Sequence, residues 1–160
     1  MAKIILLCGK VCSGKSTYAI KIQPEYHAVI LSADELMLEL FEEQLGEDHH
    51  PILEKVKHYL YQLAEQIVKT NTHVILDFGF WTRSERQQIK QHYAQKGIIT
   101  ELHYLRVDPE VWSRNIEKRN INLHHTNSKN YYIDEKMKYS FSSMFEEPDH
   151  SEIDVEIRIS

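Results

Sequence analysis

The stretch Gly9-Lys10-Val11-Cys12-Ser13-Gly14-Lys15-Ser16 constrains this chain more than any other feature. It matches the pattern Gly-x-x-x-x-Gly-Lys-[Ser/Thr] of the phosphate-binding P-loop, also called Walker A. The glycines permit backbone angles that turn successive N–H groups toward one point, and these groups form a nest for an anion. A helix that begins at the end of the loop adds the positive end of its dipole. The stretch therefore predicts a loop that holds phosphate.

The position of this loop favours that interpretation over a glycine turn that contains Lys-Ser by chance. The apolar run 3–8 before it is typical of a strand buried in a parallel sheet, and a helix is predicted from Lys15 to Ile22, ending near Pro24. We expect Lys15 to reach the β- and γ-phosphates of a nucleoside triphosphate and Ser16 to hold Mg²⁺. The predicted nucleotide contacts are Gly9, Lys10, Val11, Cys12, Ser13, Gly14, Lys15, Ser16 and Thr17.

Cys12 has two interpretations. A thiol near the start of a helix can be activated, because the helix dipole favours the thiolate. Alternatively, Cys12 is a small residue whose contribution is its backbone amide.

Strands and helices alternate along the rest of the chain. Strands are predicted at 27–31, 74–76, 98–107 and 153–159, and helices at 32–46, 51–69, 84–96, 108–119 and 132–144. Alternation of this kind indicates βαβ units and a parallel sheet. We predict one α/β domain over residues 1–160, a three-layer doubly wound parallel sheet with the P-loop nucleoside triphosphate hydrolase fold. The first strand should be central, beside the strands that end near Leu31 or Asp77 and near Val107.

Two local patterns refine this prediction. Ser32 and Glu35 have the spacing of a capping box at the start of the helix at 32–46. Apolar and polar residues alternate over 153–159, which is typical of an edge strand.

Composition excludes several classes of protein. The chain has 160 residues, a net charge of −5 and a pI of about 6.0, so it lacks the basic surface of a protein that coats long nucleic acid. Its start does not resemble a secretory signal, and no apolar run is long enough to span a membrane. Cys8 and Cys12 lie too close together for a disulfide framework. We expect a cytoplasmic protein with reduced thiols.

Several segments resemble the small P-loop kinases. The resembled group includes the polynucleotide 5′-kinase domain, chloramphenicol phosphotransferase, the zeta-toxin kinases and the predicted-kinase family related to them. The resemblance covers nearly the whole chain and implies a Mg-ATP-dependent kinase of the nucleotide-kinase fold type. The segments that carry it are Lys3–Ala19, Leu31-Ser-Ala-Asp34-Glu35, Val74-Ile-Leu-Asp77, Phe80–Arg86, Trp112–Arg119 and Phe145-Glu-Glu-Pro148.

Two aspartates follow predicted strands, at the sheet edge where ligands of open α/β folds bind. In the resembled kinases an aspartate in the place of Asp34 contacts the acceptor, and phosphoryl transfer to a hydroxyl needs such a base. Asp77 closes an apolar strand in the manner of a Walker B carboxylate, so we expect it to orient Mg²⁺ together with Ser16. The alternatives are an early helix residue favoured by the dipole for Asp34 and a turn residue for Asp77.

Cations ahead of a polar segment suggest a lid. Arg114, Lys118 and Arg119 precede the polar segment 120–130. The resemblance implies a lid at about residues 114–131, from which Arg114 and Arg119 would act on the transferring phosphoryl group. A solvated charged face is the alternative.

Other polar residues are weaker candidates. Arg83 and Arg86 could contact substrate, although they fall on a helix face that we expect to be exposed. The pairs His49-His50 and His124-His125 have no Cys or carboxylate at ligand spacing, so a metal site there is not expected.

The acceptor is less defined than the nucleotide. Polynucleotide kinases of this type carry an arginine three residues after the base aspartate, where this chain has Met37. We therefore expect a small-molecule hydroxyl acceptor, with a nucleic-acid 5′ end as an alternative. A regulatory protein that binds and hydrolyses ATP without a small acceptor is a further alternative. A GTP switch is not favoured, because no Asn-Lys-x-Asp motif occurs.

Overall fold

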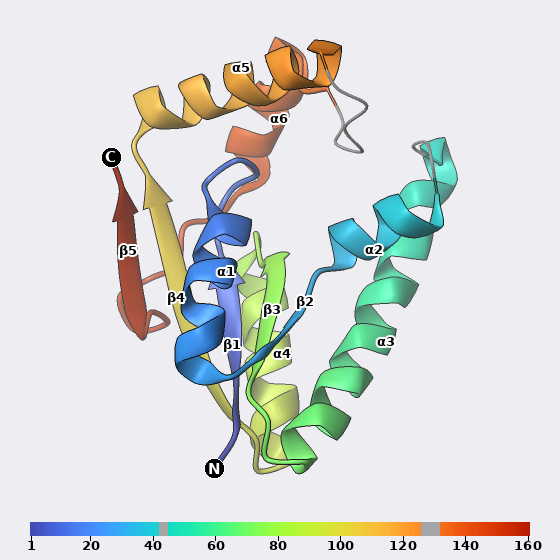
Figure 1. Ribbon diagram of the computed structural model, residues 1–160, viewed down its shortest axis with the longest axis vertical. Helices are drawn as coiled ribbons and strands as arrows, with labels where there is room; N and C mark the ends of the chain where they lie inside the picture. The colour runs from blue at the N-terminus through green and yellow to red at the C-terminus, as the bar shows by residue number, and fades with distance from the viewer. Residues whose placement is uncertain (42–44, 126–131) are drawn as a thin grey trace.

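A five-stranded parallel sheet forms the centre of the molecule (Figure 1). The computed structural model describes residues 1–41, 45–125 and 132–160. Strand β1 lies between β3 and β4, as predicted, and β5 is an edge strand. The strand order across the sheet is β2 (Val29–Leu31), β3 (Val74–Gly79), β1 (Lys3–Cys8), β4 (Ile99–Val107) and β5 (Val155–Ile159).

Helices cover both faces of this sheet, which confirms the doubly wound α/β fold. Helix α1 packs on one face, and α3 and α4 pack on the other, while α5 and α6 lie across the carboxyl end of the strands (Figure 1). Helix α2 and the short 3-10 helix η1 connect β2 to α3. Within the described ranges no helix is long and apolar enough to cross a membrane. The bounds are α1 Lys15–Tyr26, α2 Ala33–Leu40, η1 Gly46–Asp48, α3 His49–Lys69, α4 Arg83–Gln95, α5 Pro109–His125 and α6 Glu135–Met144.

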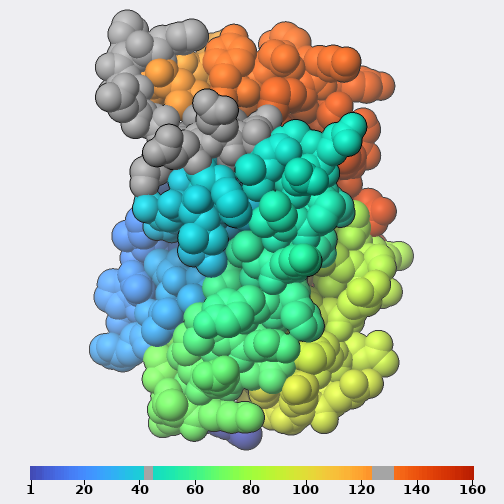
Figure 2. Space-filling view, turned by 90° about the vertical axis from the view of Figure 1, so that its right-hand side faces the viewer, coloured from blue at the N-terminus to red at the C-terminus, as the bar shows by residue number. Residues whose placement is uncertain are grey.

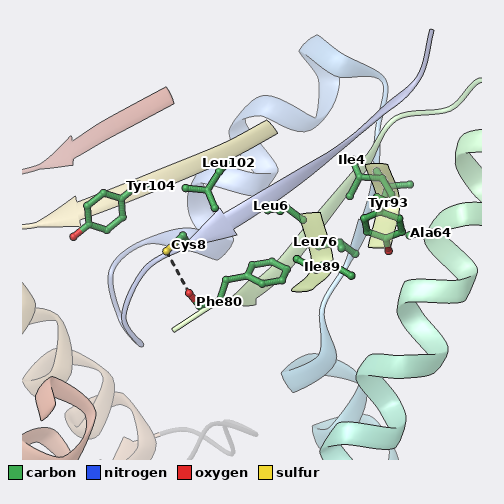
Figure 3. Close-up of a cluster of buried hydrophobic side chains, with 11 residues drawn as sticks. Ile4, Leu6, Cys8, Ala64, Leu76, Phe80, Ile89, Tyr93, Leu102 and Tyr104 are labelled. Carbon is green, nitrogen blue, oxygen red and sulfur yellow. Dashed lines mark hydrogen bonds between the residues drawn. The ribbon is translucent and has the colours of Figure 1, made fainter. Parts of the chain in front are cut away.

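The apolar run of β1 is continuous because this strand is buried on both faces. Ile4, Leu6 and Cys8 belong to the cluster under α3 and α4, which Figure 3 shows together with Tyr93 and Ala64. Ile5 and Leu7 belong to the cluster under α1. Each large apolar side chain buried in this way contributes about 1.5–3 kcal/mol. The central strand is therefore held rigidly, and so is the loop that leaves it.

Two helices extend beyond their predicted ends. Helix α1 runs through Pro24 to Tyr26, since a proline near the helix end removes only one hydrogen bond. Helix α5 continues to His125 instead of ending near Arg119, and it therefore includes the first part of the polar segment 120–130. Asn120 stabilises this extension by two side-chain hydrogen bonds to the backbone of Ile133, of 2.7 and 2.9 Å.

A third helix is shorter than predicted. Helix α2 ends at Leu40, ahead of the predicted end near Gly46. Its N-terminus is capped as expected, because Ser32 Oγ accepts a hydrogen bond of 3.2 Å from the Glu35 N–H. Residues 42–44, and residues 126–131 of the predicted lid, lie outside the described residues.

Candidate phosphate-binding site

The predicted phosphate loop joins the end of β1 to the start of α1. Gly14 has φ +94°, a left-handed angle that glycine adopts without a steric penalty, and Cys12 has φ +58°. At Gly9 only glycine fits, since a Cβ there would lie 2.7 Å from Ser13 Oγ and 3.3 Å from the Leu105 carbonyl oxygen. The loop therefore has the tight backbone that a phosphate nest requires.

The ammonium group of Lys15 lies over this loop. Lys15 Nζ donates a hydrogen bond of 3.0 Å to the carbonyl oxygen of Lys10, which also accepts one of 3.2 Å from the Ser13 N–H. The positive charge is thereby held beside the loop and the N-terminus of α1. Both features favour the binding of an anion.

Ser16 and Asp77 meet at the carboxyl edge of the sheet. Ser16 Oγ donates a hydrogen bond of 2.8 Å to Asp77 Oδ2, although 61 positions separate the two residues. Asp77 is only 7% exposed. A hydroxyl and a carboxylate are oxygen ligands of the kind that Mg²⁺ prefers, so this pair fits the ion that the sequence predicts there.

An open cavity of about 1740 Å³ extends from this loop between α2, α3 and α4. Figure 2 shows the face of the molecule that α2 and α3 form, with α5 and α6 above them. Asp34, in the first turn of α2, is exposed and lines this cavity together with Lys15, Ser16 and Asp77. The fold therefore brings the predicted acceptor-side carboxylate into the same space as the phosphate loop.

The three cations of α5 do not share one environment. Arg119 lines the cavity, and its Nη1 donates to the Sγ atom of Cys12 at 3.2 Å. Arg114 and Lys118 are exposed and are not among the cavity-lining residues. Their positions around the helix explain the difference, because only the face with Arg119 is turned toward the loop.

Arg86 contradicts the expectation of an exposed helix face. Its side chain is fully buried and donates hydrogen bonds of 2.9 Å to Glu152 Oε1 and to the Phe80 carbonyl oxygen. Phe80 has φ +48°, a left-handed backbone angle that is unfavourable for a residue with a Cβ. The hydrogen bond from Arg86 to its carbonyl oxygen helps to hold this conformation. Arg83 is about half exposed, with 48% of its side chain accessible, and pairs with Asp149.

Three side chains that contact the loop were missed by the sequence analysis as functional residues. Trp81 Nε1 donates to the Gly9 carbonyl oxygen at 3.0 Å, Trp112 Nε1 to that of Val11 at 2.7 Å, and Asn115 Nδ2 to that of Cys12 at 3.0 Å. The only available signal was that both tryptophans of the chain fall in segments of the kinase resemblance. These contacts span 72 to 103 positions, and no local spacing predicts them.

The remaining walls of the cavity combine apolar and charged groups. Beside Trp81, the wall is formed by Met137, Phe141 and Met144 of α6 and by Ile133, two positions before this helix. Opposite, Lys57 of α3 donates to Glu85 of α4 at 2.7 Å. His49 and His50 also line the cavity, and the described part of the chain contains no group of three His, Cys, Asp or Glu side chains placed to hold a metal ion. The side chains of His124 and His125 lie outside what the structure describes.

At its far end the cavity contains a second bridge between α3 and α4. Glu65 accepts hydrogen bonds of 2.6 Å from His92 and 3.1 Å from Lys96. Burial disfavours the carboxylate of Glu65, but these two hydrogen bonds outweigh it and hold its pKa below the usual value. Glu65 is therefore ionised throughout the neutral range.

The model of the AAA domain family AAA_33 matches residues 4–141. The chain belongs to this family. No curated protein matches the chain. Many solved structures share its fold, and three of them, all at low identity, are covered over most of their length.

A protein of Chloroflexus aurantiacus assigned as a kinase has a TM-score of 0.72 at 14% identity, over 99% of this chain and 87% of that one. Kti12 of Chaetomium thermophilum, in complex with ADP-AlF3, has a TM-score of 0.71 at 13% identity, over 98% and 88%. The APS kinase CysC of Mycobacterium tuberculosis, in complex with AMPPNP and APS, has a TM-score of 0.65 at 14% identity, over 98% and 88%. At these identities the likeness establishes a P-loop kinase fold, while a special relation to polynucleotide kinase, chloramphenicol phosphotransferase or zeta toxins stays a prediction.

Proposed function

We propose that this protein is an ATP-dependent phosphotransferase that acts on a hydroxyl group of a small molecule. The observation that carries the proposal is the 2.8 Å contact between Ser16 and Asp77 beside the phosphate loop, in the same cavity as Asp34. A phosphate loop, a pair of metal-ligand oxygens and a separate carboxylate are the parts that phosphoryl transfer to a hydroxyl uses.

Each side chain has a distinct role in this proposal. Lys15 and the loop N–H groups bind the β- and γ-phosphates, and Arg119 adds positive charge from α5. Ser16 and Asp77 would hold Mg²⁺, which neutralises phosphate charge when bound. Asp34 accepts the proton of the acceptor hydroxyl and so makes its oxygen a better nucleophile. The proposal includes a lid at about residues 114–131, whose cation in the cavity is Arg119; Arg114, the second cation expected there, is exposed and is not among the lining residues.

The acceptor side favours a small molecule over a nucleic-acid 5′ end. Met37 is 2% exposed and is not among the residues that line the cavity. The position that would carry the arginine of the resembled polynucleotide kinases therefore faces the core, where it cannot hold a target phosphate. The apolar wall of Trp81, Met137 and Phe141 suits a compact molecule with an apolar face.

Substitution of Asp34 tests this function. Asp34→Asn should lower the rate of phosphoryl transfer by about 10²–10⁴-fold and leave ATP affinity nearly unchanged, because the amide cannot accept the proton. Asp77→Asn should instead weaken the dependence on Mg²⁺. Glu35→Gln, one residue further along the same exposed turn, is the matched control. ATP consumption with sugars, nucleosides, antibiotics and RNA 5′ ends is the measurement, with basal hydrolysis as the first readout.

The outcomes separate the candidate functions. Wild-type rates of hydrolysis and transfer in Asp34→Asn would remove the base assignment. If in addition no acceptor stimulated ATP consumption, the regulatory ATP-binding protein would replace the kinase. Stimulation by RNA ends alone would move the acceptor to nucleic acid.

A further inference from the structure

Helix α5 contacts the phosphate loop with one face. Trp112, Asn115 and Arg119 have the spacing that places side chains on the same side of a helix. Their contacts converge on two consecutive loop residues: Trp112 and Asn115 donate to the carbonyl oxygens of Val11 and Cys12 at 2.7 and 3.0 Å, and Arg119 donates to the Cys12 thiol at 3.2 Å. Figure 1 shows α5 lying across the carboxyl end of the sheet, where this loop begins.

The direction of a carbonyl also sets the direction of an N–H. A trans peptide unit is planar, and its C=O and N–H bonds point to opposite sides. Because Trp112 holds the Val11 carbonyl on the outside of the loop, the N–H of Cys12 turns to the inside, where a nest binds phosphate. In the same way Asn115, which holds the Cys12 carbonyl, orients the N–H of the next residue, Ser13. That N–H donates a hydrogen bond of 3.2 Å to the Lys10 carbonyl oxygen across the loop.

The backbone of the loop needs these hydrogen bonds from α5 at Cys12. Cys12 has φ +58°, which is unfavourable for a residue with a Cβ, and such conformations persist where the surroundings hold them on several sides. The two peptide units that flank Cys12 are the two held from α5. Glycine at this position would have adopted the angle without help.

Helix α5 is itself a firm base for these contacts. Trp112 is 5% exposed and belongs to a buried cluster with Ile116 and Ile133, against which Val11 and Cys12 pack. On the other side of the loop, Trp81 holds the Gly9 carbonyl at 3.0 Å. The phosphate loop is therefore fixed by donors from two segments that lie far from it in the sequence, helix α5 and the turn after β3.

We propose that Trp112 and Asn115 are positioning residues of the phosphate site. They keep the loop in its phosphate-binding conformation and thereby set the affinity for the polyphosphate chain of a nucleotide. This inference rests on the proposed nucleotide-dependent function and assigns to α5 a part in nucleotide binding besides the cation that Arg119 contributes. A displacement of α5 should consequently weaken nucleotide binding.

Two variants test the proposal. Trp112→Phe removes the indole donor but keeps an aromatic ring, and Asn115→Leu removes the amide donor at similar size. Calorimetric titration uses Mg-ADP and inorganic tripolyphosphate, a probe without base or ribose. Each variant should bind both probes about tenfold more weakly or worse, while Asn115→Gln, which retains an amide donor, should recover much of the affinity. Glu117→Gln, at an exposed position of the same helix, is the control and should bind like wild type.

Thermal unfolding without ligand separates a positioning role from a merely structural one. A positioning residue lowers the affinity for the probes in a protein that is still folded at the temperature of the titration. Wild-type affinity for tripolyphosphate in an Asn115→Leu protein would overturn the proposal, whatever its melting temperature. If Trp112→Phe fails to fold, Asn115→Leu decides alone, since Asn115 is only half-buried. A wild-type protein that binds neither probe would overturn the proposed function, and this inference with it, whereas a binding wild type with equally good variants would overturn this inference only.

Discussion

At the scale of single residues, the site depends on the precise placement of a few polar atoms. Lys15 Nζ lies 3.0 Å from the Lys10 carbonyl oxygen, and Ser16 Oγ lies 2.8 Å from Asp77. Neither side chain is part of the buried apolar clusters. Their substitution should therefore affect ligand binding far more than folding.

Lys15→Ala should abolish nucleotide-dependent stabilisation with little change in the melting temperature of the free protein. A ligand present at about 100 times its Kd stabilises the folded state by about 2.7 kcal/mol, and this gain should be seen for wild type only. Thermal melting with and without Mg-ATP is the measurement. Lys21→Ala, an exposed position on the same helix, should behave like wild type. Equal stabilisation of wild type and Lys15→Ala would show that phosphate binds elsewhere.

The two cysteines should differ sharply in reactivity. Cys8 is fully buried, and burial raises the pKa of its thiol to about 12 against the weaker opposing effects of Arg86 and Lys15. Cys12 is half-buried and lines the cavity. Iodoacetamide at neutral pH should label Cys12 and leave Cys8 intact, and Mg-ATP should slow the labelling. Peptide mass spectrometry measures this, and labelling of both thiols at one rate would contradict it.

At the scale of elements, the turn after β3 is held by the C-terminal segment of the chain. Arg86 of α4 joins the Phe80 carbonyl to Glu152, and the Glu146 N–H donates to the Trp81 carbonyl at 2.8 Å. These contacts place Trp81 against the phosphate loop. The segment after α6 thus supports the site without lining it.

Arg86→Met should destabilise the protein by about 3–5 kcal/mol, because it removes the close cation from the mostly buried Glu152 carboxylate, which is then left with the Asp149 N–H and a 4.0 Å contact with Arg83. Arg83→Met on the same helix removes a half-exposed ion pair with Asp149 and only a long contact of 4.0 Å with Glu152, so it should cost at most about 1 kcal/mol. Urea unfolding monitored by circular dichroism gives both values. If both variants lowered the free energy of unfolding by the same amount, the buried Arg86–Glu152 pair would contribute no more to stability than the half-exposed pair of Arg83.

At the scale of the whole molecule, two bridges tie distant elements together through carboxylates. Glu65 of α3 binds His92 of α4 and Lys96, which directly follows α4. Glu101 of β4 binds Lys3 of β1 and His103 of its own strand. For Glu101, as for Glu65, burial disfavours the charge, but the hydrogen bonds outweigh it and the pKa lies below the usual value. Both groups therefore couple stability to pH.

Acid should weaken the fold through these two carboxylates. Because their pKa is lowered on folding, the stability they contribute is complete above the unfolded value of about 4.3 and is lost as the pH falls through the folded value. The urea midpoint should fall between about pH 5 and pH 3, and Glu65→Gln should show a shallower fall than wild type. Glu117→Gln, an exposed carboxylate, should follow wild type. A wild-type slope in Glu65→Gln would exclude Glu65 as a source of the effect.

Local patterns in the sequence were enough to predict the fold class and the phosphate loop. A buried parallel strand needs a continuous apolar run, a phosphate nest needs glycines at defined positions, and a helix start needs a cap such as Ser32. These requirements are local, so a short stretch of residues is enough to express them. The candidates for the two strands beside β1 could also be limited to a few, because βαβ connections follow few topologies.

Which distant side chains contact the loop depends instead on how the helices pack. Arg86 and Arg119 are both arginines on predicted helices, yet one is buried under the β3 turn and the other lines the cavity. The contacts of Trp112 and Asn115 with Val11 and Cys12 likewise depend on how α5 crosses the sheet edge. Helix rotation and crossing are set by packing between elements far apart in the chain, and no local pattern of residues specifies them.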